Sequence, residues 1–205
     1  MMNSDLKLHW ENIYSSKKED GVSWFQEHPK TSIDLIEKYS TDKSISIIDI
    51  GSGRSKILKN LIENEYDDLT YLDISQEACS KSKISLGLKQ DLVQWYVENV
   101  LDFNTEKNFS IWHDRAVFHF LISKEDVEKY KQVALKIIVQ GGYLILGTFS
   151  ENGPEKCSGL NVSRYSPESL KKIFNPEFKM IESFTIDHKT PFDTNQNFLF
   201  SIFKK

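Results

Sequence analysis

The chain has 205 residues, of which 39% are apolar and 27% charged, a composition typical of a globular protein with a sizeable core. Its formal net charge is −4 and it has no basic block, which argues against nucleic acid as a partner. No apolar run approaches the ~20 residues that span a bilayer, and the polar start of the chain lacks the apolar centre of a signal peptide. We therefore expect a cytoplasmic protein without a membrane partner.

The two cysteines, Cys79 and Cys157, show no spacing that indicates a metal site. Both are predicted to be free thiols, and no bound metal is expected.

Residues 1–40 are predicted to be helical. Apolar side chains recur there at helical spacing, at Leu6, Trp10, Ile13 and Tyr14. After a loop at Gly21, a second helix begins near Pro29, because proline suits the first turn of a helix.

From residue 45 onward, short apolar runs alternate with helical stretches. The predicted strands are ISIIDI (45–50), LTYLDI (69–74), VQWYV (93–97), FSIWH (109–113) and YLILGTF (143–149). Strands that alternate with helices indicate right-handed βαβ units, and hence a parallel sheet with helices on both faces.

The end of the chain follows another pattern. Two further strands, FKMIESFTIDH (178–188) and NFLFSIF (197–203), are joined by the turn-rich segment KTPFDTNQ. No helix fits between them, so they are predicted to pair antiparallel. No interdomain linker is found, and we predict one domain over 1–205, with a lid at 1–40 and a core at 45–205.

A glycine-rich turn, Asp49-Ile50-Gly51-Ser52-Gly53, follows the first strand. Such a turn lets a ligand approach the backbone, and open α/β sheets bind ligands at the carboxyl ends of their strands. The alternative is a tight turn without a ligand.

Asp73 ends the second strand, where an acidic side chain can accept hydrogen bonds from both ribose hydroxyls. The alternative is that it caps the next helix, a role for which Ser75 is well suited. The two motifs together favour a cofactor that contains a nucleoside.

Two cofactor-binding motifs are absent from the sequence, and their absence narrows the choice of cofactor. A dinucleotide fingerprint requires a third glycine where this chain has Lys56, and the phosphate-loop sequence is absent. A nicotinamide-dependent oxidoreductase is therefore disfavoured. S-adenosylmethionine (SAM) carries no phosphate, and Asp49 is placed to meet its ammonium group directly or through water.

Polar residues also follow the next two strands. After the third strand, Asn99 could meet the adenine amino group and Val100 could supply a backbone donor, although a surface loop is the alternative. After the fourth strand, the guanidinium of Arg115 could make two parallel hydrogen bonds to a carboxylate, such as that of the methionine moiety. The alternative is a structural ion pair with Asp114.

Two residues of the fourth strand, His113 and Asp114, are the candidate general bases if the reaction needs one. His119 lies in an apolar run and is predicted to be a packing residue.

These motifs resemble those of class I SAM-dependent methyltransferases. IIDIGSG, YLDIS and the strand-four segment are similar to motifs I, II and IV, and WHDRAVFHFL and GTFSENGPEKCSGLNVSRYSPESL resemble small bacterial enzymes of this fold. The Asp-Arg-Ala pattern with SKEDVEKY resembles the thiopurine methyltransferase family. HWENIY and VSWF (22–25) are similar to the lid of that family and of some protein-lysine methyltransferases.

The resemblance implies an α/β, Rossmann-like, seven-stranded, mostly parallel sheet of order 3-2-1-4-5-7-6, its last strand antiparallel, with helices on both faces. It implies SAM as the cofactor. Carried over to this chain, the cofactor-binding residues would be Gly51 and Gly53 at the methionine end, Asp73 at the ribose, Asn99 and Val100 at the adenine, Arg115, and Trp10 and Trp24 as the lid. Asn99 stands where many relatives have Asp, but it still offers an acceptor.

The expected reaction is in-line methyl transfer to a small molecule that bears a thiol, selenol or amine. The strand-four segment lacks the Asn-Pro-Pro-Tyr type sequence, which disfavours planar amide and amino nitrogens. The alternatives are a protein-lysine methyltransferase and a SAM-binding protein without catalysis. The acceptor is expected between the lid around Trp24, the segment Arg164-Tyr165 and the loop from His188 to Gln196.

Overall fold

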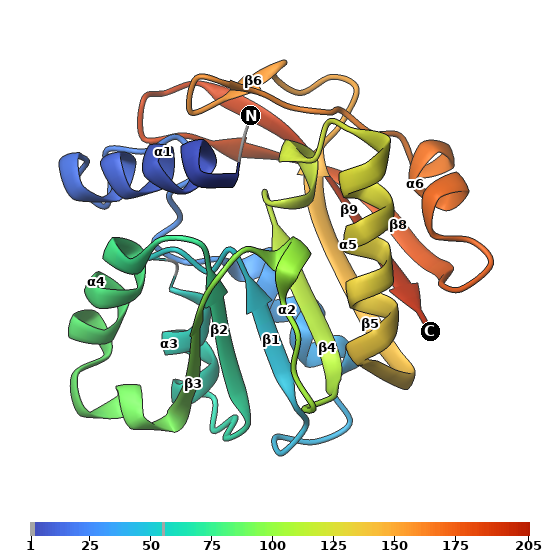
Figure 1. Ribbon diagram of the computed structural model, residues 1–205, viewed down its shortest axis with the longest axis horizontal. Coiled ribbons are helices and arrows are strands. Elements are labelled where there is room, and N and C mark those ends of the chain that lie inside the picture. The colour runs from blue at the N-terminus through green and yellow to red at the C-terminus, as the bar shows by residue number, and fades with distance from the viewer. Residues whose placement is uncertain (1–2, 55) are drawn as a thin grey trace.

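The computed structural model describes residues 3–54 and 56–205, so the first two residues of the predicted lid lie outside the described residues. Its main sheet has seven strands in the order β3-β2-β1-β4-β5-β9-β8 (Figure 1). The strands are β1 (Ile47–Ile50), β2 (Leu69–Asp73), β3 (Val93–Val97), β4 (Phe109–Arg115), β5 (Ile138–Phe149), β8 (Lys179–Lys189) and β9 (Asn195–Lys204).

The strand directions confirm the predicted fold class. β1 to β5 pair in parallel, whereas β9 is antiparallel to both β5 and β8. The order is the predicted one once a small hairpin, β6 (Lys156–Cys157) and β7 (Leu160–Asn161), is counted. That hairpin was not predicted, because its four paired residues are too few to show the alternation of apolar and polar residues that indicates a strand.

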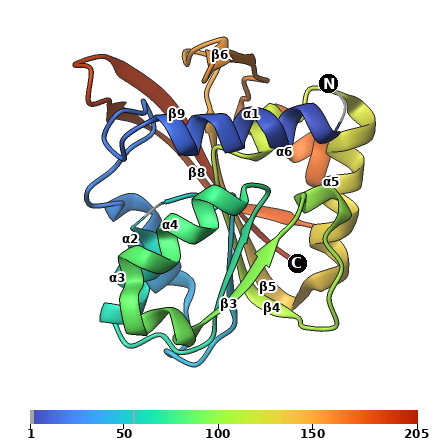
Figure 2. The ribbon, with the colours of Figure 1, turned by 60° about the vertical axis from the view of Figure 1, so that its left-hand side comes forward.

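Helices cover both faces of the sheet, as Figure 2 shows. Side chains of α2 (Lys30–Tyr39), α3 (Ile57–Glu63) and α4 (Gln76–Leu86) share one buried apolar cluster, and those of α5 (Lys124–Ile137) and α6 (Pro167–Phe174) share the other. Ser75 caps α4 as expected, since its hydroxyl accepts the N–H of Ala78 at 3.1 Å.

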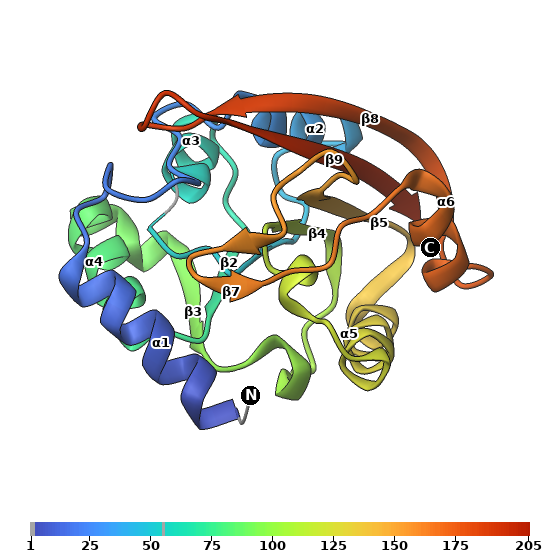
Figure 3. The same cartoon turned by 90° about the horizontal axis from the view of Figure 1, so that it is seen from above.

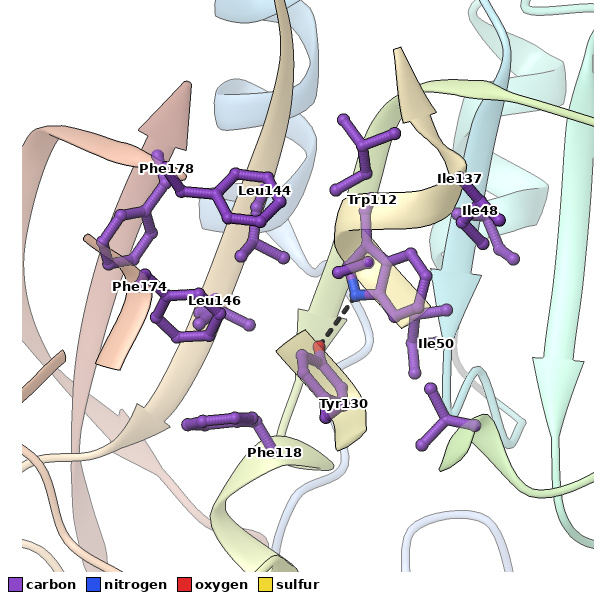
Figure 4. Close-up of a cluster of buried hydrophobic side chains, with 14 of the residues drawn as sticks. Ile48, Ile50, Trp112, Phe118, Tyr130, Ile137, Leu144, Leu146, Phe174 and Phe178 are labelled. Atoms are coloured by element: carbon purple, nitrogen blue, oxygen red, sulfur yellow. Dashed lines mark hydrogen bonds between the residues drawn. The ribbon is translucent and has the colours of Figure 1, made fainter. Parts of the chain in front are cut away.

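The cluster beneath α5 and α6 is rich in aromatic side chains (Figure 4). Trp112 and Tyr130 lie at its centre, and the indole N–H of Trp112 donates to the Tyr130 hydroxyl at 2.8 Å. A buried indole needs such a partner, and this one fixes α5 against β4.

Helix α1 (Asn3–Ser16) covers neither face of the sheet. It lies across the carboxyl ends of the parallel strands, beside the start of α4, and the β6–β7 hairpin lies over the same end (Figures 1 and 3). These two elements bound the edge of the sheet at which open α/β folds bind ligands.

Candidate functional site

Two pockets meet at the carboxyl ends of β1, β2 and β4. The first, named here the Asp73 pocket, has a volume of about 780 Å³ including its open mouth, and its lining includes Trp10, Asp73, Asn99, Val100, Phe120 and Cys157. The second, named the Asp49 pocket, has a volume of about 690 Å³, and its lining includes Pro29, Asp49, Ser52, Arg54 and His113. Both are lined by Tyr14, Trp24, Ile50, Gly51 and Arg115. The pockets are therefore neighbours around Gly51.

The glycine turn needs its two glycines. Gly51 and Gly53 have φ of +59° and +55°, a region that residues with a Cβ rarely adopt. A Cβ on Gly51 would overlap the side chain of Val117, and one on Gly53 would overlap the hydroxyl of Tyr14. The two glycines therefore allow Val117 and Tyr14 to pack closely against the turn.

Asp73 is brought together with the other predicted nucleoside contacts. Its two carboxylate oxygens accept the backbone N–H groups of Gly53 and Ser75, both at 2.8 Å. Burial raises the pKa of Asp73 to about 7. Asp73 lines the same pocket as Asn99 and Val100, the residues predicted to meet the adenine.

Asn99 begins a short 3₁₀ helix, η2 (Val100–Asp102). Its side-chain oxygen accepts the N–H of Leu101 at 2.9 Å, which holds the loop in place. Because the residue also lines the Asp73 pocket, the loop belongs to the site and is not merely a surface connection.

His113 has a different environment from the one expected of a general base. It is fully buried, with Nδ1 2.7 Å from Oδ1 of Asp49 and Nε2 2.9 Å from the hydroxyl of Ser32 in the first turn of α2. Both ring nitrogens are engaged, so no nitrogen is left to take a proton from an acceptor. The geometry makes His113 a positioning residue that links Asp49 to α2.

Loss of the Ser32 hydroxyl tests this link. Ser32→Ala should lower the free energy of unfolding by about 1–3 kcal/mol, because it leaves a buried ring nitrogen without its partner. SAM affinity should stay within about threefold. Urea unfolding and calorimetry measure the two quantities, with the exposed Ser85→Ala of α4 as the control. Equal stability of the two variants would contradict the proposed link.

Asp114 is not part of the site, which corrects its prediction as a catalytic group. It is fully buried, lines neither pocket, and accepts the N–H groups of Val117 (2.9 Å) and Phe118 (3.1 Å) and the hydroxyl of Tyr130 (2.6 Å). Burial raises its pKa to about 6. Its partners show that it shapes the turn after β4, and it does so without the predicted alternative of a pair with Arg115.

Arg115 lies between the two pockets. Its Nη1 donates to the carbonyl of Trp24 at 3.1 Å, and its Cζ lies 4.5 Å from the ring centre of Phe198. Its Nη2 is buried and has no hydrogen-bond partner in the described part of the chain. Burial lowers the pKa of the guanidinium to about 10, so the group stays charged at neutral pH.

Trp10 of α1, predicted by resemblance to belong to the lid, lines the Asp73 pocket. Its ring makes edge contacts with Trp24 (5.7 Å between centroids) and Phe120 (5.2 Å). All three side chains line the Asp73 pocket, so aromatic rings form the wall of this pocket that faces the lid.

Glu11 fastens α1 to the start of α4 and was not foreseen. Its carboxylate accepts the hydroxyl of Ser75 (2.7 Å) and the N–H groups of Gln76 (2.8 Å) and Glu77 (2.9 Å). Although burial opposes it, these bonds lower the pKa of Glu11. Nothing in the sequence around Glu11 indicates that its side chain caps a helix that begins 65 residues later.

The lid segment around Trp24 is fastened on its other side. Nε2 of His188 lies 2.8 Å from the carbonyl of Ser23, and the side-chain amide of Gln196 donates to the Ser23 hydroxyl at 3.2 Å. The predicted acceptor loop between β8 and β9 thus meets the lid through its two ends.

The expected acceptor segment Arg164-Tyr165 needs correction. Tyr165 is buried in the apolar cluster beneath α5 and α6, and Arg164 contacts Glu155 at 3.2 Å outside both pockets. Cys157, earlier in the same connection, lines the Asp73 pocket instead. The hairpin turn at residues 158–159 places this thiol there.

Within residues 3–54 and 56–205, no group of three or more His, Cys, Asp or Glu side chains is arranged to hold a metal ion. In the same residues, no helix has the length and apolar character needed to cross a membrane.

Comparisons with known proteins find distant relatives and a shared fold. No protein-family model matches the chain. The chain is 24% identical over 192 residues to EEF1A lysine methyltransferase 2 of Danio rerio, which covers 85% of this chain and 76% of that protein.

Solved structures share the fold along the whole chain. One was described for the conversion of a disulfide bond into a thioacetal group during echinomycin biosynthesis (TM-score 0.78, 15% identity, 100% of this chain and 93% of that chain). Another is the 1,6-didemethyltoxoflavin-N1-methyltransferase of Burkholderia thailandensis, with bound 1,6-didemethyltoxoflavin and S-adenosylhomocysteine (TM-score 0.76, 13% identity, 100% and 91%).

The strand order and the comparisons give this chain the class I fold of SAM-dependent methyltransferases. The predicted fold is confirmed, and the proteins that the chain resembles belong to the predicted enzyme class.

Proposed function

We propose that the chain transfers the methyl group of SAM to a small molecule that bears a thiol, selenol or amine. The observation that carries the proposal is the pair of pockets around Gly51. In this arrangement Asp73, Asn99 and Val100 would hold the adenosine, and Asp49 would face the ammonium group of the methionine moiety. Residues 1–40 would form the lid and 45–205 the SAM-binding core of one domain, a division that stays a prediction.

The residues present fit this cofactor. The buried carboxylate of Asp73 is an acceptor of the kind that ribose hydroxyls need, and Gly51 of the glycine turn lines both pockets. SAM supplies a methyl group already activated by its sulfonium, so alignment and exclusion of water are the main tasks of the protein. Trp10 and Trp24 would exclude water, and Arg115 would lie where the two pockets meet.

A small acceptor is supported by the way the lid is held. Glu11 fastens α1 to α4, and His188 fastens the Trp24 segment to the last two strands. A site covered from both sides suits a molecule that can enter whole, whereas a side chain on a folded protein needs an open channel.

A lysine side chain on a partner protein is the second candidate acceptor. It is favoured by the relative from Danio rerio, whose name assigns it that substrate class. Substrate specificity is usually set by loops on a rigid scaffold, and loops vary most between distant relatives. The substrate of this relative therefore does not by itself determine the acceptor of the present chain.

An assay with labelled SAM separates the candidates. The full chain is incubated with a panel of small thiols, selenols and amines, and in parallel with a lysate from cells that lack the gene. We expect labelled small molecules and no labelled protein band. Labelled bands alone would favour the lysine alternative, and binding of S-adenosylhomocysteine without any labelling would favour a protein without catalysis.

A further inference from the structure

Arg115 brings a buried positive charge to the junction of the two pockets. Nη1 is used by the Trp24 carbonyl and the face of the guanidinium by Phe198, while Nη2 has no partner. No carboxylate forms an ion pair with this guanidinium among residues 3–54 and 56–205. Because a buried charge is costly unless it is paired, this one indicates an anion that binds here.

A second buried donor without a partner, on His119, lies within the electrostatic reach of Arg115, although its side chain lines neither pocket. His119 is fully buried, and its Nδ1 accepts the N–H of Phe149 at 3.3 Å, which leaves the proton on Nε2. That Nε2 has no partner in the described residues. Burial, and then the charge of Arg115, lower the pKa of His119 to about 3, so the ring remains a neutral donor.

The titratable groups near Arg115 are poor bases. The thiol of Cys157 lines the Asp73 pocket, but burial raises its pKa to about 12. Burial and the charge of Arg115 lower the pKa of His188, whose Nε2 lies 2.8 Å from the Ser23 carbonyl. Carboxyl groups do line the pockets, but Asp73 is assigned to the ribose and Glu19 lies 3.4 Å from the ammonium of Lys56. An acceptor that arrives without its proton needs none of these groups.

Building on the proposed function, we propose that the acceptor binds as an anion, a thiolate or selenolate whose charge pairs with Nη2 of Arg115. The charge of Arg115 favours the anionic form of a thiol, but for Cys157 burial outweighs it and keeps that thiol protonated. The site therefore suits an acceptor whose own thiol is already ionised in water. A lysine ammonium would face a like charge at the same position.

The step then balances without a base. A lone pair of the acceptor sulfur or selenium forms a bond to the methyl carbon. The bond between that carbon and the sulfonium sulfur breaks, and its electron pair stays on that sulfur. The products are a neutral thioether or selenoether and neutral S-adenosylhomocysteine, and no proton moves.

Two probes of opposite charge test this inference on the full chain. 4-Nitrothiophenol is an anion at neutral pH, and N-acetyl-lysinamide is a cation. We expect kcat/KM for methylation of the thiolate to exceed that for the lysinamide at least tenfold. Arg115→Gln should lower the thiolate value at least tenfold and change the Kd of S-adenosylhomocysteine less than threefold. Arg164→Gln, which alters an arginine paired with Glu155 outside the pockets, should change neither.

Each other outcome overturns the inference. An equal loss of S-adenosylhomocysteine affinity in Arg115→Gln would assign Arg115 to the methionine carboxylate. If Arg115→Gln kept the full kcat/KM for the thiolate, Nη2 would bind an ordered water and not the acceptor. Preference for the lysinamide, or methylation of neither probe, would exclude an anionic acceptor even if the variant does not fold. Absence of S-adenosylhomocysteine binding by the unaltered chain would instead contradict the proposed function itself.

Discussion

Gly51→Ala should reduce SAM affinity at least a hundredfold and lower the free energy of unfolding by roughly 2–5 kcal/mol. The left-handed backbone at φ +59° costs an alanine about 1–2 kcal/mol. The new Cβ would also overlap the side chain of Val117, and such overpacking typically costs about 1–3 kcal/mol. Val117 lines the Asp73 pocket, so its displacement would alter the space for the cofactor. Calorimetric titration and urea unfolding measure both effects.

Gly87→Ala is a control outside the pockets. Gly87 also has a positive φ, +56° with ψ −130°, but a Cβ there would meet nothing within 4 Å, and the residue lines neither pocket. It should therefore show the backbone cost alone and retain SAM affinity. If the two variants lost affinity equally, the close approach at Gly51 would have no part in binding.

The fold could be predicted because its signals are local. Apolar runs bounded by glycines, such as the one before Gly51, define the parallel strands, and the absence of a helix between the last two strands defines the antiparallel end. Ser75 was recognised as a cap from its position alone. The hairpin around Cys157 could not be predicted, because so short a pairing depends on the elements beneath it.

The site could be predicted only in part. Residues that follow a strand directly, such as Asp73 and Asn99, were placed correctly at the sheet edge because the topology determines that edge. The alternation along β4 was harder to interpret. Neighbours in a strand face opposite sides, so Asp114 points to the α5 cluster while Arg115 reaches the pockets. Contacts between distant elements, such as that of Glu11 with α4, leave no sequence signal.

Asp73→Ala should reduce SAM affinity at least tenfold, since it removes the proposed acceptor of two ribose hydroxyls. Hydrogen bonds to a charged group contribute about 1.5–3 kcal/mol each. The variant also leaves the N–H groups of Gly53 and Ser75 without their acceptor, so a lower free energy of unfolding should accompany the loss. Asp34→Ala, on the exposed face of α2, should change neither quantity. Unchanged affinity in a folded Asp73 variant would place the ribose elsewhere.

The raised pKa of Asp73 gives this prediction a pH dependence. Ribose hydroxyls donate to the ionised carboxylate, and the pKa of about 7 means that the free protein becomes protonated there below neutral pH. Affinity for S-adenosylhomocysteine should therefore fall below pH 7, by at most about tenfold per pH unit for one proton.

The stability of the protein without a ligand should change with pH in the opposite sense. Because the folded pKa lies above the ordinary value of 3.8, the contribution of Asp73 to stability is largest below about pH 4 and is lost as the pH rises towards 7. Calorimetry and urea unfolding between pH 5.5 and 8, on the order of half a unit apart, measure the two trends. Asp73→Asn, which cannot ionise, should remove both; if its affinity keeps the same pH dependence, another group titrates in the site.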